Sequence, residues 1–144
     1  MISKAKILYF VHLPPPLHGV STVNKFIAGS ALINEGFEIK IISINYSNDL
    51  NQLDSFSVRK IFKLVSLIFK VLFNLIVFKP NYVYFSIVPL GVGFIRDSFF
   101  VVLFKVFGAK IIYHLHGNGI SDVKNILIYN YRFWNMAFSR HTCF

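Results

Sequence analysis

Four short apolar runs, separated by segments long enough to form helices, constrain the fold of this chain most. The runs are rich in Ile, Val, Tyr and Phe and cover residues 6–13, 38–45, 82–87 and 110–115. Apolar periodicity with Gly and Pro boundaries predicts helices over 20–34, 57–78, 96–107 and 123–137. Strands that alternate with helices indicate βαβ units and a parallel sheet. We therefore predict an α/β domain with a Rossmann-like, doubly wound parallel sheet.

Right-handed crossovers favour the strand order 3-2-1-4-5 for such a sheet. The fifth strand would begin at 141–144, so the sheet is expected to be incomplete at the C-terminus. In this order strands one and four are neighbours, and each runs into a His-Gly dipeptide: His18-Gly19 after the first and His116-Gly117 after the fourth. Open α/β sheets bind ligands at their carboxyl edge. Both turns are therefore expected to face one crevice.

The first turn, from Pro14 to Gly19, leads directly into a predicted helix for which Ser21 and Thr22 are candidate caps. Gly19 would let a ligand approach the backbone closely, and the N–H groups at a helix start suit a phosphate. An ordinary βα turn uses Gly and Pro equally well. The turn lacks the Gly-x-Gly-x-x-Gly spacing of dinucleotide binders and the Lys of a P-loop, so neither NAD binding nor ATP hydrolysis is favoured.

The second turn contains His114 and His116, which point to the same side of an extended strand. A metal site is one interpretation, but no carboxylate or Cys accompanies them. The alternative is a buried, hydrogen-bonded His114 with His116 contacting a ligand above the crevice. Arg96 could reach a phosphate there, whereas Asp97 is expected to cap the first turn of its helix.

Charge and composition restrict the partners. The chain has 144 residues, the size of one domain, with 17 Phe and a net charge of +9. Such a charge favours an anionic partner. Nucleic acid is disfavoured, because the basic residues are interleaved with large aliphatic side chains. The single Cys143 excludes an internal disulfide, and we find no Ser-His-Asp set or paired carboxylates at catalytic spacing.

The predicted helix over 57–78 lies in a stretch without acidic residues, which extends from Asp54 to Asp97. Spacings of three and four place a polar stripe on one side of it, formed by Lys60, Lys63, Ser66, Lys70 and Asn74. Three interpretations stay open: a helix at a membrane surface, a core helix, and a membrane span. The first would bring four cationic residues to an anionic bilayer: Arg59, Lys60, Lys63 and Lys70.

Four segments carry a resemblance to a known family: KILYFVHLPPPLHGVS at 6–21, KPNYVYF at 79–85, FIRD at 94–97 and YHLHG at 113–117. In order and spacing they resemble the N-terminal half of bacterial family 4 glycosyltransferases, over essentially the whole chain. The resemblance implies a retaining enzyme with two facing Rossmann-like domains, the GT-B fold. It also implies transfer of a sugar from a nucleotide-sugar donor to a glycan or lipid-linked acceptor in cell-surface polysaccharide synthesis, with no further cofactor and no metal.

The resemblance assigns roles to individual residues. His18, Gly19 and Val20 would lie beside the donor diphosphate, and His116 with Gly117 would contact the donor sugar. Residues 1–144 would form the acceptor-side domain, at the inner face of the cell membrane in the cytoplasm.

The donor-side half of the family, with its basic residue and two-glutamate motif, has no counterpart in this sequence. We therefore expect a truncated product that is inactive alone, rather than half of an enzyme completed by a separate chain. A non-enzymatic, membrane-associated binding subunit that completes a site with a partner chain is the alternative.

Overall fold

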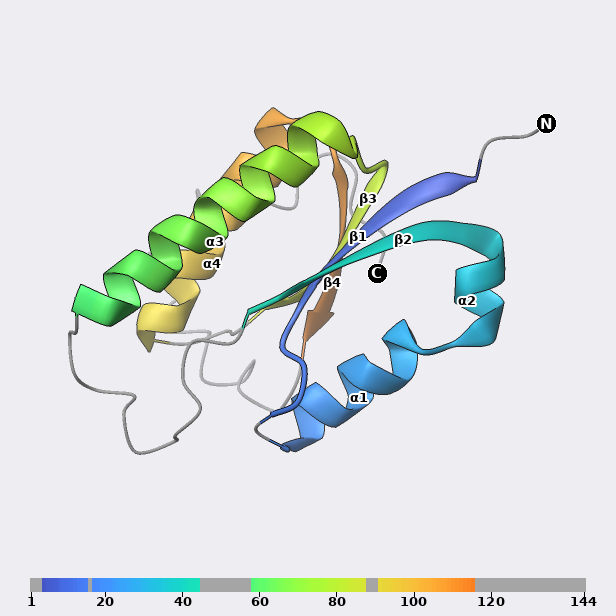
Figure 1. Cartoon of the computed structure of the whole chain (residues 1–144), viewed down its shortest axis with the longest axis horizontal. Helices are drawn as coiled ribbons and strands as arrows, with labels where there is room; N and C mark the ends of the chain where they lie inside the picture. Colours follow the sequence, from blue (N-terminus) through green and yellow to red (C-terminus); the bar gives the residue numbers. More distant parts are fainter. Residues whose placement is uncertain (1–3, 16, 45–57, 88–90, 116–144) are drawn as a thin grey trace, which may run out of the picture.

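A computed structural model describes residues 4–15, 17–44, 58–87 and 91–115. Within them the chain alternates strands and helices (Figure 1). In chain order the elements are β1 (Ala5–Val11), α1 (Gly19–Ala28), α2 (Ala31–Gly36), β2 (Phe37–Ser43), α3 (Val58–Val77), β3 (Tyr82–Ile87), α4 (Gly91–Val106) and β4 (Lys110–Leu115). The predicted α/β class is confirmed. The predicted fifth strand and the helix over 123–137 lie outside the described residues.

All the described strands are parallel, and their order in the sheet is β2-β1-β3-β4. This corrects the predicted order 3-2-1-4-5, because β3 pairs with β1 rather than lying beyond β2. Strand β2 explains the difference. Its Glu38 and Lys40 are exposed, and charged side chains suit the edge of a sheet far better than an interior position. With β2 at the edge, the chain must return across β1 to place β3.

The helices form a layer on each side of the sheet. Helices α1 and α2 lie on one face, whereas α3 and α4 lie on the other (Figure 1). The connection from β1 to β2 runs in one direction along the sheet, and the connections from β2 to β3 and from β3 to β4 run in the opposite direction. Right-handed crossovers then require the helices to change face after β2. The sheet is therefore doubly wound, as predicted.

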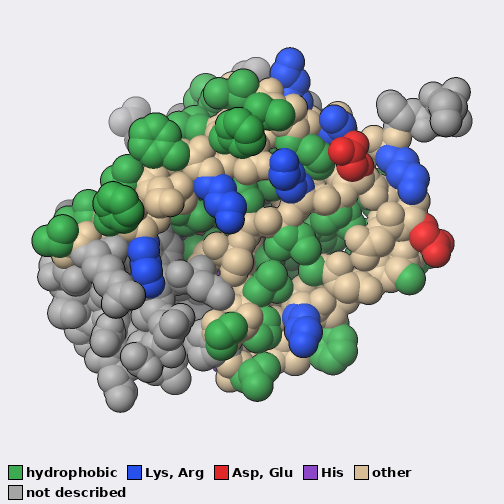
Figure 2. Space-filling model, viewed as in Figure 1, with side chains coloured by type: hydrophobic (Ala, Val, Ile, Leu, Met, Phe, Trp, Pro, Cys, Tyr) green, Lys and Arg blue, Asp and Glu red, His purple; other side chains and the backbone are tan. Residues whose placement is uncertain are grey.

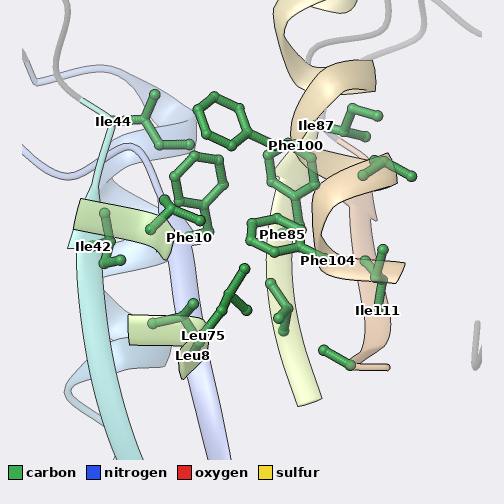
Figure 3. Close-up of a cluster of buried hydrophobic side chains, with 14 of the residues drawn as sticks. Leu8, Phe10, Ile42, Ile44, Leu75, Phe85, Ile87, Phe100, Phe104 and Ile111 are labelled. Atoms are coloured by element: carbon green, nitrogen blue, oxygen red, sulfur yellow. The ribbon is translucent and has the colours of Figure 1, made fainter. Parts of the chain in front are cut away.

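The larger hydrophobic core lies between the sheet and the α3–α4 layer (Figure 3). Its centre is the Phe10 ring, whose centroid is 4.7 Å from that of Phe100 and 5.2 Å from that of Phe85. A smaller cluster around Ile7, Tyr9 and Val11 faces α1 and α2. Alternate residues of β1 thus enter different cores, which explains why the whole strand reads as a continuous apolar run.

Helix boundaries follow local chemistry. The predicted helix over 20–34 is two helices, separated at Gly29 and Ser30, and the Asn34 amide donates to the Ser30 carbonyl oxygen at 2.8 Å. The second of them, α2, ends at Gly36. Gly108 does end α4, with a φ of 74° that suits glycine.

Candidate functional site at the carboxyl edge of the sheet

The topological switch point of this sheet lies between β1 and β3. These two strands are hydrogen-bonded neighbours, yet β1 leads to α1 on one face and β3 leads to α4 on the other. Ligand sites of open α/β sheets lie outside the carboxyl ends of strands at such a point. The sequence analysis placed the crevice between the first and fourth strands. This is wrong, because β3 lies between β1 and β4, and the neighbour of β1 at the switch point is β3. The start of α4, with Arg96 in its second turn, takes the place that the second His-Gly turn was expected to have.

His18 caps helix α1, a role that the sequence analysis gave to Ser21 or Thr22. The His18 Nδ1 atom accepts a hydrogen bond from the Ser21 N–H at 3.1 Å, and the Ser21 Oγ accepts one from the His18 N–H at 3.1 Å. The pair forms a reciprocal capping box with a histidine in place of the usual Ser or Thr. Part of the hydrogen-bonding capacity of His18 is thus committed to the fold.

Gly19 and Val20 form the first positions of α1, beside this cap. A Cβ atom added to Gly19 would contact nothing within 4 Å, and the backbone there has no positive φ. The fold therefore does not require glycine at this position. The open space beside it leaves the helix start accessible, as the phosphate interpretation of this turn requires.

His12, at the end of β1, is a residue that the sequence analysis did not select. Burial lowers its pKa to about 4, with further lowering from the positive charges of Arg96 and His18, against a raising hydrogen bond with the Ile44 backbone. The imidazole is therefore neutral near pH 7 and lies within electrostatic range of Arg96. The sequence did contain a signal for this residue, because His12 lies at the carboxyl end of a predicted buried strand, where ligand sites of open α/β sheets are found.

Asn24 packs under His12 from helix α1. Its side chain is fully buried, and its Nδ2 donates to the His12 carbonyl oxygen at 3.0 Å. No described residue donates a hydrogen bond to its Oδ1. This hydrogen bond ties the middle of α1 to the residue that follows β1 and so helps to hold the turn between them.

Arg96 and Asp97 form a close ion pair inside helix α4. The Asp97 Oδ1 lies 2.7 Å from the Arg96 Nε and 2.6 Å from its Nη2. The predicted capping role of Asp97 is wrong, because α4 begins at Gly91 and Asp97 lies in its second turn. The Asp97 side chain is fully buried, and that of Arg96 is 17% exposed. The carboxylate holds the guanidinium in place and offsets its charge, which leaves Arg96 a weaker phosphate ligand than predicted.

His114 is hydrogen-bonded, as one interpretation of the sequence expected, but it is only partly buried. Its Nδ1 contacts the hydroxyl of Tyr84 on the neighbouring strand, and burial lowers its pKa. Burial also raises the pKa of Tyr84 to about 12, with a contribution from Tyr9. In the described part of the chain, no cluster of three or more His, Cys, Asp or Glu side chains could hold a metal ion. His116 and Gly117 lie outside the described residues.

Helix α3 carries the predicted polar stripe, but the stripe does not form its solvent face. Asn74 is buried, with its Nδ2 donating to the Lys70 carbonyl oxygen at 2.6 Å, and Lys63 is half-buried. The stripe therefore runs along one flank. The outward face is apolar and includes Phe62, Phe69 and Phe73 at 76%, 68% and 61% exposure. The side chains of Arg59 and Lys60 lie outside the described set.

The apolar outer face continues onto α4. The exposed large side chains of α4 are Ile95, Phe99, Val102 and Val106, and the exposed Phe107 follows the helix. Figure 2 shows hydrophobic side chains along the outside of α3, at the upper left, with Lys and Arg side chains on one flank and acidic side chains away from that face, at the right. None of the helices in the described ranges combines the length and apolar character needed to cross a bilayer.

No protein-family model matches this sequence, and no curated protein or solved structure matches it either. The site must therefore be interpreted from its own chemistry. That chemistry comprises an open helix start at Gly19, a neutral imidazole at His12, the Arg96 guanidinium held by Asp97, and an apolar, basic-flanked layer of helices on one face.

Proposed function

We propose that this chain is the acceptor-side domain of a retaining glycosyltransferase that uses a nucleotide-sugar donor at a membrane surface. The observation that carries the proposal is the switch point between β1 and β3, where helices α1 and α4 both begin. Helix starts that follow the carboxyl ends of two neighbouring strands favour the negative charge of a diphosphate. The sequence resemblance in the same turn supplies the reaction class, a sugar transfer in cell-surface polysaccharide synthesis.

In this proposal the helix start at His18, Gly19 and Val20 faces the donor diphosphate. The capping box holds the turn in one conformation before a ligand arrives, which lowers the entropic cost of binding. The positive ends of the helices would then stabilise the diphosphate as it leaves the sugar. His116 is proposed to contact the donor sugar, on the resemblance alone.

The outer face of α3 and α4 is proposed to rest on the inner leaflet of the cell membrane. This face combines large exposed apolar side chains with cations and has no exposed acidic side chain. The sequence has no acidic residue between Asp54 and Asp97. Asp97 itself is buried and paired with Arg96. This is the composition of an interfacial surface. Self-association through the same face would bring lysines against lysines, so an anionic bilayer fits it better. A lipid-linked acceptor would be reached from that surface.

Replacing Gly19 by aspartate tests the donor site. A carboxylate in the first turn of α1 favours the helix, and open space surrounds the position, so the variant should fold. The same charge would repel a diphosphate, and we expect the affinity for UDP or GDP to fall about tenfold or more. Isothermal titration measures this. Binding is the readout rather than turnover, because the chain is expected to be inactive alone.

Gly19→Ala is the matched control for that experiment. It makes the same backbone change without the charge and should bind UDP or GDP within about twofold of the parent protein. Equal affinity of all three proteins would contradict a diphosphate site at this helix start.

A non-enzymatic, membrane-associated binding subunit is the second candidate. Two observations favour it: the His18 side chain takes part in a cap, and Arg96 is paired with a buried carboxylate. Both interactions reduce the number of side chains at the site that are available for catalysis. A chain that binds vesicles but neither UDP nor GDP would support this candidate over the glycosyltransferase.

A further inference from the structure

Five lysines converge at the amino edge of the sheet, opposite the proposed donor site. They are Lys4 before β1, Lys6 in β1, Lys40 in β2, Lys79 after α3 and Lys110 at the start of β4. The first and last are more than a hundred positions apart in the sequence, so only the parallel arrangement of the strands brings them together. We call these residues the amino-edge lysines.

Four of these lysines line two adjoining hollows. The larger hollow has a volume of about 650 Å³ and is lined in part by Lys4, Lys6 and Lys79. The smaller one, of about 420 Å³, is lined in part by Lys4 and Lys110. The two share Lys4 and Asn81. A ligand with more than one anionic group could therefore contact lysines in both hollows at once.

The charge of these hollows is strongly unbalanced. Four lysines and one acidic residue, Glu38, line them, which leaves a charge of +3. The Glu38 Oε2 atom is 3.9 Å from the Lys6 Nζ, and both side chains are substantially exposed, so this pair is weak. Gathering like charges opposes folding, and a bound anion offsets that cost.

Structural roles account for only part of the set. The Nζ atoms of Lys6 and Lys40 lie 5.2 and 5.5 Å from the centroid of the Phe78 ring, which is a cation–π arrangement. Lys79 follows the C-terminus of α3, where a cation complements the helix dipole. Neither explanation covers Lys4, which lines both hollows.

We propose that the amino edge is a binding site for a ligand that carries several phosphate groups. Lysine binds phosphate as a point charge, and lysines on separate strands and loops can contact separate phosphates. The ligand could be a soluble polyphosphate or phospholipid headgroups, since the exposed Ile76 and Val77 at the end of α3 lie just before Lys79. This site is at the opposite edge from the donor site and does not depend on it.

The test compares two triple variants that remove the same charge. The first, Lys4→Gln with Lys79→Gln and Lys110→Gln, removes exposed lysines that line the hollows. The control, Lys25→Gln with Lys63→Gln and Lys70→Gln, removes lysines on α1 and α3. Tripolyphosphate is titrated calorimetrically into each protein at low salt, after thermal melts have shown that all three are folded.

We expect the first variant to bind tripolyphosphate at least about tenfold more weakly than the parent protein, and the control to change affinity less than about threefold. An equal loss in both variants would show a general charge effect and overturn the proposal. Absence of tripolyphosphate binding by the parent protein would also overturn it, because vesicle binding alone is already expected from the outer face of α3 and α4.

A competition measurement identifies the source of the phosphates. If tripolyphosphate displaces the parent protein, but not the first triple variant, from vesicles containing phosphatidylglycerol, lipid headgroups occupy the amino edge. If tripolyphosphate binds without displacing vesicles, the ligand is soluble. Either result supports the site. The first triple variant should bind UDP or GDP like the parent protein, because its lysines line only the amino-edge hollows, so failure of the donor site is distinguishable from failure of this one.

Discussion

Replacing Phe69 and Phe73 together by serine is expected to weaken vesicle binding about thirtyfold. Both rings lie on the outer face of α3, are more than half exposed and are absent from the buried core. Insertion of each ring into the acyl boundary contributes about 1 kcal/mol, so the pair contributes about 2 kcal/mol. The folded protein should be unharmed, because neither side chain supports the packing under α3. Sedimentation with vesicles containing phosphatidylglycerol measures the change.

The matched control for that experiment is Phe26→Ser with Leu32→Ser. These residues are also highly exposed, at 74% and 81%, but they belong to α1 and α2 on the opposite face of the sheet. Their loss removes similar apolar area and should leave vesicle binding within about twofold. If both double variants bind vesicles equally well, the α3 face is not the membrane-contacting surface. Added salt should weaken the contribution of the lysines to vesicle binding and leave the contribution of the phenylalanines unchanged.

Acidification from pH 7 to pH 4.5 is expected to lower the free energy of unfolding by about 2 kcal/mol through His12 alone. Its pKa is about 4 in the folded protein against an ordinary 6.5, so the unfolded chain binds the proton first as pH falls. The stabilisation is fully present above pH 6.5 and is lost progressively down to pH 4. Burial is the main cause, with the positive charge of Arg96 second.

Urea unfolding of the parent protein and of His12→Asn at the two pH values measures this contribution. Asparagine has no titratable group, so the variant should lose less stability on acidification, and the difference between the two proteins should be about 2 kcal/mol. The lowered pKa of His114 acts in the same direction and is common to both proteins. Equal pH dependence of the two proteins would show that His12 is not held neutral by the fold.

Much of the secondary structure could be predicted from local patterns. The strands at Tyr82–Ile87 and Lys110–Leu115 lie where the apolar runs predicted them, because β-branched and aromatic residues between polar boundaries favour the extended conformation. The helix predicted over 57–78 agrees with α3, which ends at Val77, one residue before the predicted end. The prediction of one continuous helix over 20–34 was wrong. The break at Gly29 and Ser30, with the hydrogen bond from Asn34 to the Ser30 carbonyl oxygen, cannot be seen in the apolar periodicity.

The candidate site was predicted in part. The turn at His18 and Gly19 does lie at a switch point, but its neighbour is the start of α4 and not the second His-Gly turn. Asp97 was expected at a helix start because it follows, with Arg96, a loop-like stretch that contains Pro89, Gly91 and Gly93. In the structure apolar and glycine residues form the first turn, and Asp97 is buried with Arg96.

The sequence by itself determined the succession of strands and helices, the parallel sheet, and a strongly cationic, apolar middle segment. These follow from residue periodicity and composition, which act over a few neighbouring positions. Only the tertiary structure decided the strand order, the apolar outer face of α3, and the meeting of four lysines around two hollows at the amino edge. Each of these depends on which face of the sheet a helix packs against and which strand takes the edge, and such choices are made by contacts between segments far apart in the chain.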